Sequence, residues 1–163
     1  TDSSYAADES RGWQMSKAPA WECQHSIDVD VPATFAWQYM TDVGNWSDPP
    51  AEFTLDGPFT SGAQGTTRMP GQPPAAWTVR HVDDGRAYTI EGGSFLENAR
   101  LLFHWRFDAI SNDRTRLTQH MELRGDNAAA YIEGVRDGFG PNLEPGMKRI
   151  ADLMARAWRA ISP

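Results

Sequence analysis

The chain has 163 residues and a formal net charge of -7 at pH 7, with no run of lysine or arginine. This length is typical of one domain, so we expect a single domain over residues 21–163, preceded by a flexible extension over residues 1–20. The acidic charge excludes nucleic acid and anionic membrane surfaces as favoured partners.

Cysteine usage and hydropathy favour a cytoplasmic protein. Cys23 is the single cysteine, which excludes an intrachain disulfide and a Cys-x-x-Cys metal motif. No apolar run approaches the roughly 18 residues of a membrane span, so no membrane insertion is expected, and residues 1–20 lack the plan of a signal peptide. The sequence also lacks a P-loop, a Gly-x-Ser-x-Gly elbow and a dinucleotide-binding fingerprint, so we expect no cofactor.

The first half of the chain is typical of short strands with one helical region. Residues 22–31 alternate apolar and polar side chains, which predicts a strand with one face toward the core. Pro32 is expected to open a short helix, and a turn-rich connector follows at residues 42–50. Further strands are predicted at residues 53–55, 65–69, 76–82 and 86–92, the last two joined by the hairpin turn Asp83-Asp84-Gly85.

The second half contains the clearest periodicity. Two segments, residues 100–108 and 116–124, alternate strictly and are joined by a turn at residues 111–113. A stripe at spacings of four and three then predicts an amphipathic helix that ends near Ala160. The stripe consists of Leu143, Met147, Ile150, Met154, Ala157 and Ile161. Residues 128–136 have weaker helical character, and Gly138 and Gly140 are expected to interrupt it.

Three local strings accompany this order of elements. They are Ile27-Asp28-Val29-Asp30-Val31-Pro32 before Phe35-Ala36-Trp37, the turn Leu55-Asp56-Gly57-Pro58-Phe59, and Thr115-Arg116-Leu117-Thr118 followed by Leu123-Arg124-Gly125. With them, residues 22–158 resemble the START-related SRPBCC superfamily, in particular its polyketide cyclase/dehydrase-like branch. The resemblance implies an α+β helix-grip fold. In that fold a curved antiparallel sheet of about seven strands wraps around a long C-terminal helix, with two short helices after the first strand.

The resemblance implies that a hydrophobic or aromatic small molecule, or a lipid, binds in an internal cavity between the sheet and the C-terminal helix. One alternative is a polyketide cyclase, aromatase or dehydratase-like enzyme that acts in the same cavity. A second is a non-catalytic protein-interaction module. The sequence leaves the oligomeric state open between a monomer and a homodimer.

Two polar residues on apolar strand faces are the candidate catalytic groups. His25 shares its face with Ile27, and Gln119 shares its face with Leu117 and Met121. An unpaired buried polar group costs about 1–3 kcal/mol, so each is a candidate to bind a ligand carbonyl or hydroxyl. The alternative is that the neighbouring backbone or a water satisfies each of them. His25 is also a candidate general acid or base.

The expected cavity lining is largely aromatic, although any one of these rings can instead belong to a solid core. Tyr131 and Phe139 are placed near the cavity mouth, where a glycine-rich loop would serve as a gate. The full expected lining is His25, Trp46, Phe53, Trp77, Phe103, Trp105, Gln119, Met121, Tyr131, Phe139, Met147 and Met154.

The opposite strand face is predicted to be a solvated lattice of cross-strand pairs. Its members are His104, Arg106, His120, Glu122 and Arg124. The four histidines of the chain lie on four segments without a His-x-His or His-Glu-x-x-His motif, so no metal site is predicted.

Overall fold

The computed structural model describes residues 18–163. The expected N-terminal extension therefore lies outside the described residues, except for residues 18–20. The elements in chain order are β1 (Trp21–Val29), α2 (Ala33–Thr41), the 3-10 helix η1 (Val43–Trp46), β2 (Glu52–Leu55), β3 (Gln64–Arg68), β4 (Ala75–Asp83), β5 (Ala87–Gly92), β6 (Arg100–Ser111), β7 (Arg114–Arg124), the 3-10 helix η2 (Ala128–Tyr131) and α3 (Ile132–Ile161).

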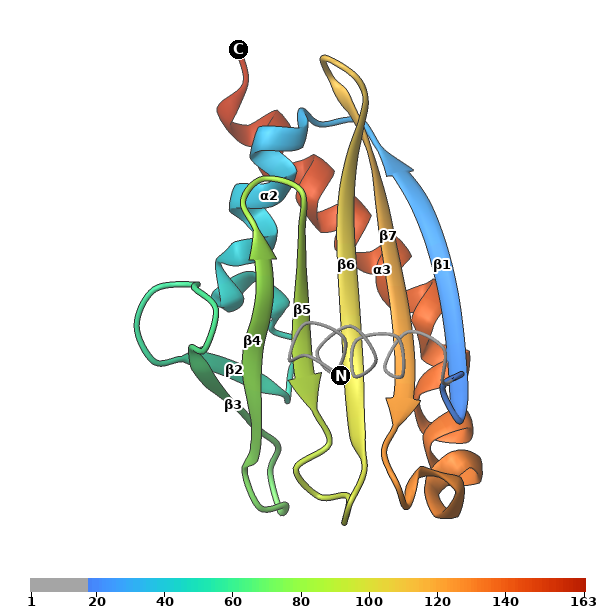
Figure 1. Ribbon diagram of the computed structural model, residues 1–163. Coiled ribbons are helices and arrows are strands. Elements are labelled where there is room, and N and C mark those ends of the chain that lie inside the picture. The colour runs from blue at the N-terminus through green and yellow to red at the C-terminus, as the bar shows by residue number, and fades with distance from the viewer. Residues whose placement is uncertain (1–17) are drawn as a thin grey trace, which may run out of the picture.

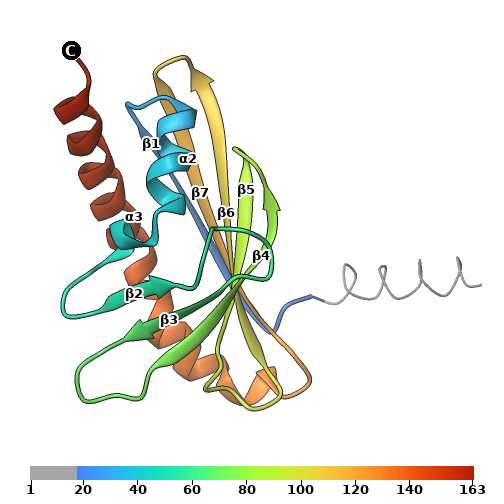
Figure 2. The same cartoon turned by 90° about the vertical axis from the view of Figure 1, so that its left-hand side faces the viewer.

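The strands form one antiparallel sheet in the order β1-β7-β6-β5-β4-β3-β2. Helices α2 and α3 lie on the same side of this sheet, which we call the inner face, and the other side is the outer face (Figure 1). Figure 2 shows the sheet in profile, with α3 running along the inner face. The seven strands, the long C-terminal helix and the short helices α2 and η1 after β1 confirm the expected α+β helix-grip fold.

The pairing of β6 with β7 decides which side chains reach the inner face. Direct pairs run from Arg100 with Arg124 to Ala109 with Thr115 before the register shifts near the turn. Because side chains alternate between the two faces of a strand, the odd-numbered residues of both strands point inward. The buried apolar residues among them are Leu101, Trp105, Phe107, Leu117, Met121 and Leu123.

The C-terminal helix differs from the expectation. An interruption was expected at Gly138 and Gly140, but α3 continues through both glycines and through Pro141 and Pro145. Each glycine costs a helix about 1 kcal/mol relative to alanine, and each proline removes one helical hydrogen bond. Residues 134–140 are therefore part of the helix, and the gate loop expected there is wrong.

Packing and one side chain explain why α3 stays continuous. Asn142 Nδ2 donates to the carbonyl oxygen of Gly138 at 3.1 Å, within the stretch that the prolines weaken. Leu143 and Met147 are 8% and 1% exposed, and burial of such a side chain contributes about 1.5–3 kcal/mol. Tertiary burial thus outweighs the poor helix propensity of this segment.

The hairpin between β4 and β5 has the expected turn and an added bulge. Gly85 has a φ of 79°, the conformation that an Asp-Gly turn favours. The register shifts between Arg80 and Asp83, and His81 within the bulge has a φ of 52° and is exposed. The bulge therefore turns His81 toward solvent.

The core consists of two clusters of buried side chains. The larger cluster joins the inner face to α2 and α3 and includes Met40, Trp105 and Met147. The smaller cluster contains Leu101, Leu123, Ala128 and Val135 near the start of α3. Neither α2 nor α3 combines the length and the apolar character that a membrane-spanning helix needs.

A glycine beneath a tryptophan ring provides a test of this packing. A Cβ on Gly65 would lie 2.2 Å from the Trp77 ring, so we expect Gly65→Ala to lower the free energy of unfolding by about 1–3 kcal/mol. Gly138→Ala is the matched control, because a Cβ there meets nothing within 4 Å, and it should add about 0.5–1 kcal/mol. Urea unfolding followed by circular dichroism measures both changes. Equal effects of the two substitutions would contradict the described packing.

Candidate functional site

Four strands place one residue each in a single row across the inner face. Tyr88 on β5 pairs with Trp105 on β6, Trp105 pairs with Gln119 on β7, and Gln119 pairs with His25 on β1. Neighbouring strands lie about 4.8 Å apart, so the row spans about 14 Å from Tyr88 to His25. Both residues that the sequence suggests as catalytic groups therefore lie side by side.

His25 and Gln119 are half-buried, and neither side chain has a hydrogen-bond partner among residues 18–163. Gln119 has a strand on each side and lies on the face that α3 covers. Phe103, which also points inward from β6, is half-buried as well. Solvent therefore reaches the inner face at the level of Gln119 and Phe103.

Tyr88 is the fully buried polar residue of the row. It is 1% exposed, and its hydroxyl has no hydrogen-bond partner among the described residues. Its ring lies 4.9 Å from that of Phe59 and is stacked on Trp46 at a centroid distance of 6.4 Å. Burial raises the pKa of the Tyr88 hydroxyl well above its usual value, so this group stays protonated and able to donate.

Tyr88 is a polar residue of the row that the sequence pattern did not indicate. Tyr88 and Ile90 occupy inward-facing positions of a predicted strand. The Tyr88 hydroxyl is therefore a polar group on an apolar face. The same signal identified His25 and Gln119. A tyrosine ring counts as apolar in a periodicity pattern, so the pattern does not indicate its hydroxyl.

Three of the expected lining residues meet at the end of the sheet near β2. Trp46 lies 5.2 Å from Trp77 and 5.9 Å from Phe53, measured between ring centroids. The Trp46 Nε1 donates to the Met40 carbonyl at 2.7 Å, and the Trp77 Nε1 lies 3.1 Å from the Thr67 hydroxyl. These two indole N–H groups already have partners, so this part of the lining offers a ligand aromatic surface.

The other expected residues lie toward α3. Phe139 on α3 lies 5.8 Å from Phe103, and Met121, which is paired with Phe103 across β6 and β7, is buried. Met147 and Met154 are 1% and 0% exposed and pack in the larger core cluster.

Tyr131 lies apart from the row. It packs on the smaller cluster, and its hydroxyl accepts a hydrogen bond from the Glu97 backbone N–H at 3.0 Å.

A groove of about 340 Å³ crosses β3, β4 and β5 and the start of the β5–β6 loop. Of the expected lining residues, only Trp77 borders this groove, together with Asp56 and Glu91. The two carboxylates make this groove a poor site for an apolar molecule.

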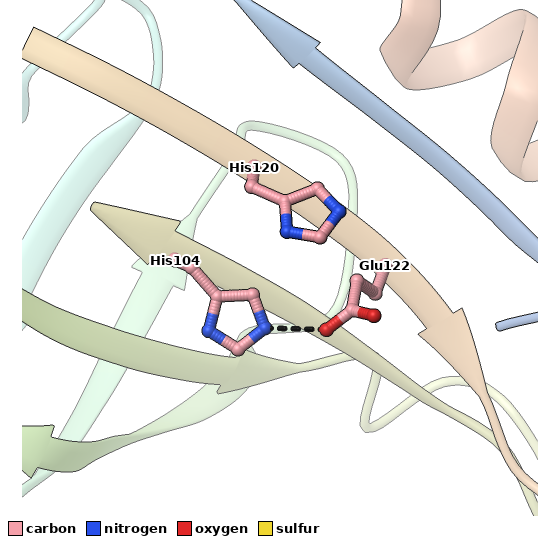
Figure 3. A group of neighbouring side chains, drawn as sticks. All are labelled: His104, His120 and Glu122. Carbon is pink, nitrogen blue, oxygen red and sulfur yellow. Dashed lines mark hydrogen bonds and ion pairs between the residues drawn. The ribbon is translucent and has the colours of Figure 1, made fainter. Parts of the chain in front are cut away.

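The outer face carries a second group of polar side chains (Figure 3). His104 Nε2 lies 2.6 Å from Glu122 Oε1, and the Nδ1 of the same imidazole lies 2.7 Å from the Thr89 hydroxyl. His120 Nε2 lies 3.0 Å from Glu22 Oε1. Glu122 is 8% exposed, so the solvated lattice expected on this face is wrong at its centre.

Electrostatics fix the charge of this group. Burial lowers the pKa of His104 and outweighs the opposing effect of Glu122, which favours a neutral imidazole. Burial would raise the pKa of Glu122, but the hydrogen bonds from Arg124 and His104 hold it below its usual value. The centre of the group is therefore an ionised carboxylate beside a neutral imidazole.

The sequence matches the family model described as "Polyketide cyclase / dehydrase and lipid transport" over residues 20–157. The chain belongs to this family. The match covers every strand and all but the last turn of α3, which confirms the resemblance drawn from the sequence. No curated protein matches the sequence.

Solved structures with the same fold include three that illustrate the range of the superfamily. Norcoclaurine synthase from Thalictrum flavum superposes with a TM-score of 0.62 at 13% identity, over 88% of each chain. The Zhui aromatase/cyclase from Streptomyces sp. R1128 gives 0.56 at 20% identity, over 83% of this chain and 90% of that chain. Protein Ms6760 from Mycobacterium smegmatis gives 0.60 at 16% identity, over 86% and 92%. At these identities the likeness shows the fold alone.

The unpaired hydroxyl of Tyr88 gives a direct prediction for the ligand-free protein. Tyr88→Phe should raise the free energy of unfolding by about 1–3 kcal/mol, because it removes a buried donor without a partner. Tyr131→Phe is the matched control and should lower it by about 0.5–1.5 kcal/mol, because that hydroxyl has a partner. Chemical denaturation measures both values. A loss of stability in Tyr88→Phe would show that the hydroxyl is already satisfied.

Proposed function

We propose that the protein binds a hydrophobic or aromatic small molecule between the inner face of the sheet and α3. The observation that carries this proposal is the fully buried Tyr88 hydroxyl, which has no partner among the described residues and lies within a wall of aromatic rings. The wall supplies apolar surface, and the hydroxyl supplies a donor for a ligand carbonyl or hydroxyl.

The row across the inner face defines the shape of the proposed ligand. Tyr88 and His25 are about 14 Å apart along the row, with Trp105 and Gln119 between them. A molecule that reaches both ends is therefore long, and it presents an apolar middle to the Trp105 ring. Gln119 and His25 offer polar contacts at the accessible end of the row. A polycyclic phenol and a lipid with a polar head both match this pattern.

The proposed setting follows from the charge and the free thiol. Cys23 has no disulfide partner among the described residues, which suits a reducing cytoplasm. The acidic chain is unsuited to nucleic acid, so the proposed partner is the small molecule alone, bound by a monomer or a homodimer.

A cyclase, aromatase or dehydratase-like activity is the second candidate. The observation that favours it is that three polar groups, on Tyr88, Gln119 and His25, share one row on the inner face. A protonated tyrosine polarises a carbonyl by hydrogen bonding, and a neighbouring imidazole moves a proton. Holding a flexible poly-β-carbonyl chain along the row would bring its reacting atoms together.

Binding is tested with protein purified gently from its own host and analysed by native mass spectrometry. We expect a stoichiometric apolar adduct, and binding of polycyclic phenols that quenches tryptophan fluorescence. Tyr88→Phe and Gln119→Leu should each weaken binding about 2- to 12-fold, the equivalent of one lost hydrogen bond of about 0.5–1.5 kcal/mol. Gln24→Leu makes the same chemical change at an exposed position on the outer face and should leave the affinity unchanged.

The results separate the candidate functions. A bound molecule that is recovered chemically unchanged supports a binding protein, whereas ring closure or loss of water from a poly-β-carbonyl probe, detected by mass spectrometry, supports the enzyme. A ligand-free mass together with no binding across the panel would overturn both and favour a protein-interaction module.

A further inference from the structure

We propose that His104, His120 and Glu122 form a binding site for one divalent transition-metal ion of the zinc class on the outer face of the sheet. Each residue offers one ligand atom, and these atoms lie within 4.8 Å of one another. The site lies on the opposite side of the sheet from the row of Tyr88 and His25, so it is independent of the proposed ligand site.

Strand pairing brings the three ligands together. His104 on β6 is directly paired with His120 on β7, and Glu122 follows two residues later on the same face of β7. Ligands at about 2.0–2.1 Å from a tetrahedral ion lie about 3.3–3.4 Å from one another. Rotations about side-chain bonds bring the three atoms to that spacing, while the paired strands hold the backbone in place.

Each imidazole has one nitrogen held by an outer partner and the other directed into the group of three ligands. The Thr89 hydroxyl lies 2.7 Å from His104 Nδ1, which leaves Nε2 facing Glu122. Glu22 lies 3.0 Å from His120 Nε2, and Figure 3 shows the other ring nitrogen of His120 on the side of His104. Metal-binding histidines typically have such a supporting hydrogen bond, which fixes the tautomer and the ring orientation.

The two carboxylate oxygens of Glu122 have different partners, which leaves one of them available to an ion. Oε2 lies 2.8 Å from the Arg124 guanidinium, and Oε1 faces His104. An ion therefore replaces the hydrogen of the His104 to Glu122 contact and leaves the Arg124 pair in place. The imidazole hydrogen then lies on Nδ1, which donates it to the Thr89 hydroxyl, so Nε2 has a lone pair for the ion.

The donor set decides which ion the site takes. Two imidazoles and one carboxylate suit zinc and its neighbours in the first transition row, whereas magnesium and calcium prefer oxygen donors alone. Three protein ligands leave a tetrahedral ion with one position for water. The half-exposed imidazoles of His104 and His120 give the ion access from solvent.

The test uses the full chain without a histidine tag, stripped of metal with a chelator. Cobalt(II) is added first, because its visible absorption reports a site with nitrogen and oxygen ligands, and zinc is then added in competition. We expect one ion per chain, displacement of cobalt by zinc, and no displacement by magnesium. The melting temperature should also rise with zinc, since the ion binds only the folded state.

Variants assign the site to these residues. His104→Gln and His120→Gln should each weaken zinc binding more than 100-fold, and Thr89→Val should weaken it about 10- to 100-fold through loss of its supporting contact. His25→Gln removes a histidine on the opposite face of the sheet and should leave the zinc affinity within twofold. Circular dichroism confirms that each variant is folded. No cobalt absorption at millimolar concentration, or equal losses in His25→Gln and His120→Gln, would overturn the proposal.

Discussion

The continuous pairing of β6 with β7 is the constraint on which the rest of the structure depends. It fixes Trp105 beside Gln119 on the inner face and His104 beside His120 on the outer face. If β7 shifted by one residue against β6, Gln119 would turn away from Trp105, and His120 and Glu122 would turn away from His104. The strict alternation of apolar side chains in the two strands opposes such a shift, because it would expose Leu117 and bury charged neighbours.

The same alternation explains why so much of the fold was predictable from the sequence. Period-two patterns located β1, β6 and β7 to within a few residues, and the Asp83-Asp84-Gly85 turn located the β4–β5 hairpin. The row on the inner face was predictable in part, because His25 and Gln119 interrupt apolar patterns in their own strands. Their direct pairing is a property of the strand register.

The features that the sequence did not predict depend on contacts between distant segments. Only the structure shows that the Tyr88 hydroxyl has no partner among the described residues, because Trp46 and Phe59 come from distant segments to enclose the ring. The group on the outer face has no local motif, since His104 and Glu122 are 18 residues apart and meet through strand pairing. The continuity of α3 was missed because glycine and proline propensities act locally, whereas the burial that outweighs them comes from the sheet.

The two prolines of α3 have a further consequence for its dynamics. Pro141 and Pro145 carry no amide hydrogen, so the carbonyls of Asp137 and Pro141 lack the helical hydrogen bond from four residues ahead. Local opening of this turn therefore requires less free energy than opening of the turns that follow it. Phe139 packs against Phe103 from the same turn. Fluctuation of this one helical turn would move the Phe139 ring away from Phe103, while both ends of α3 stay folded.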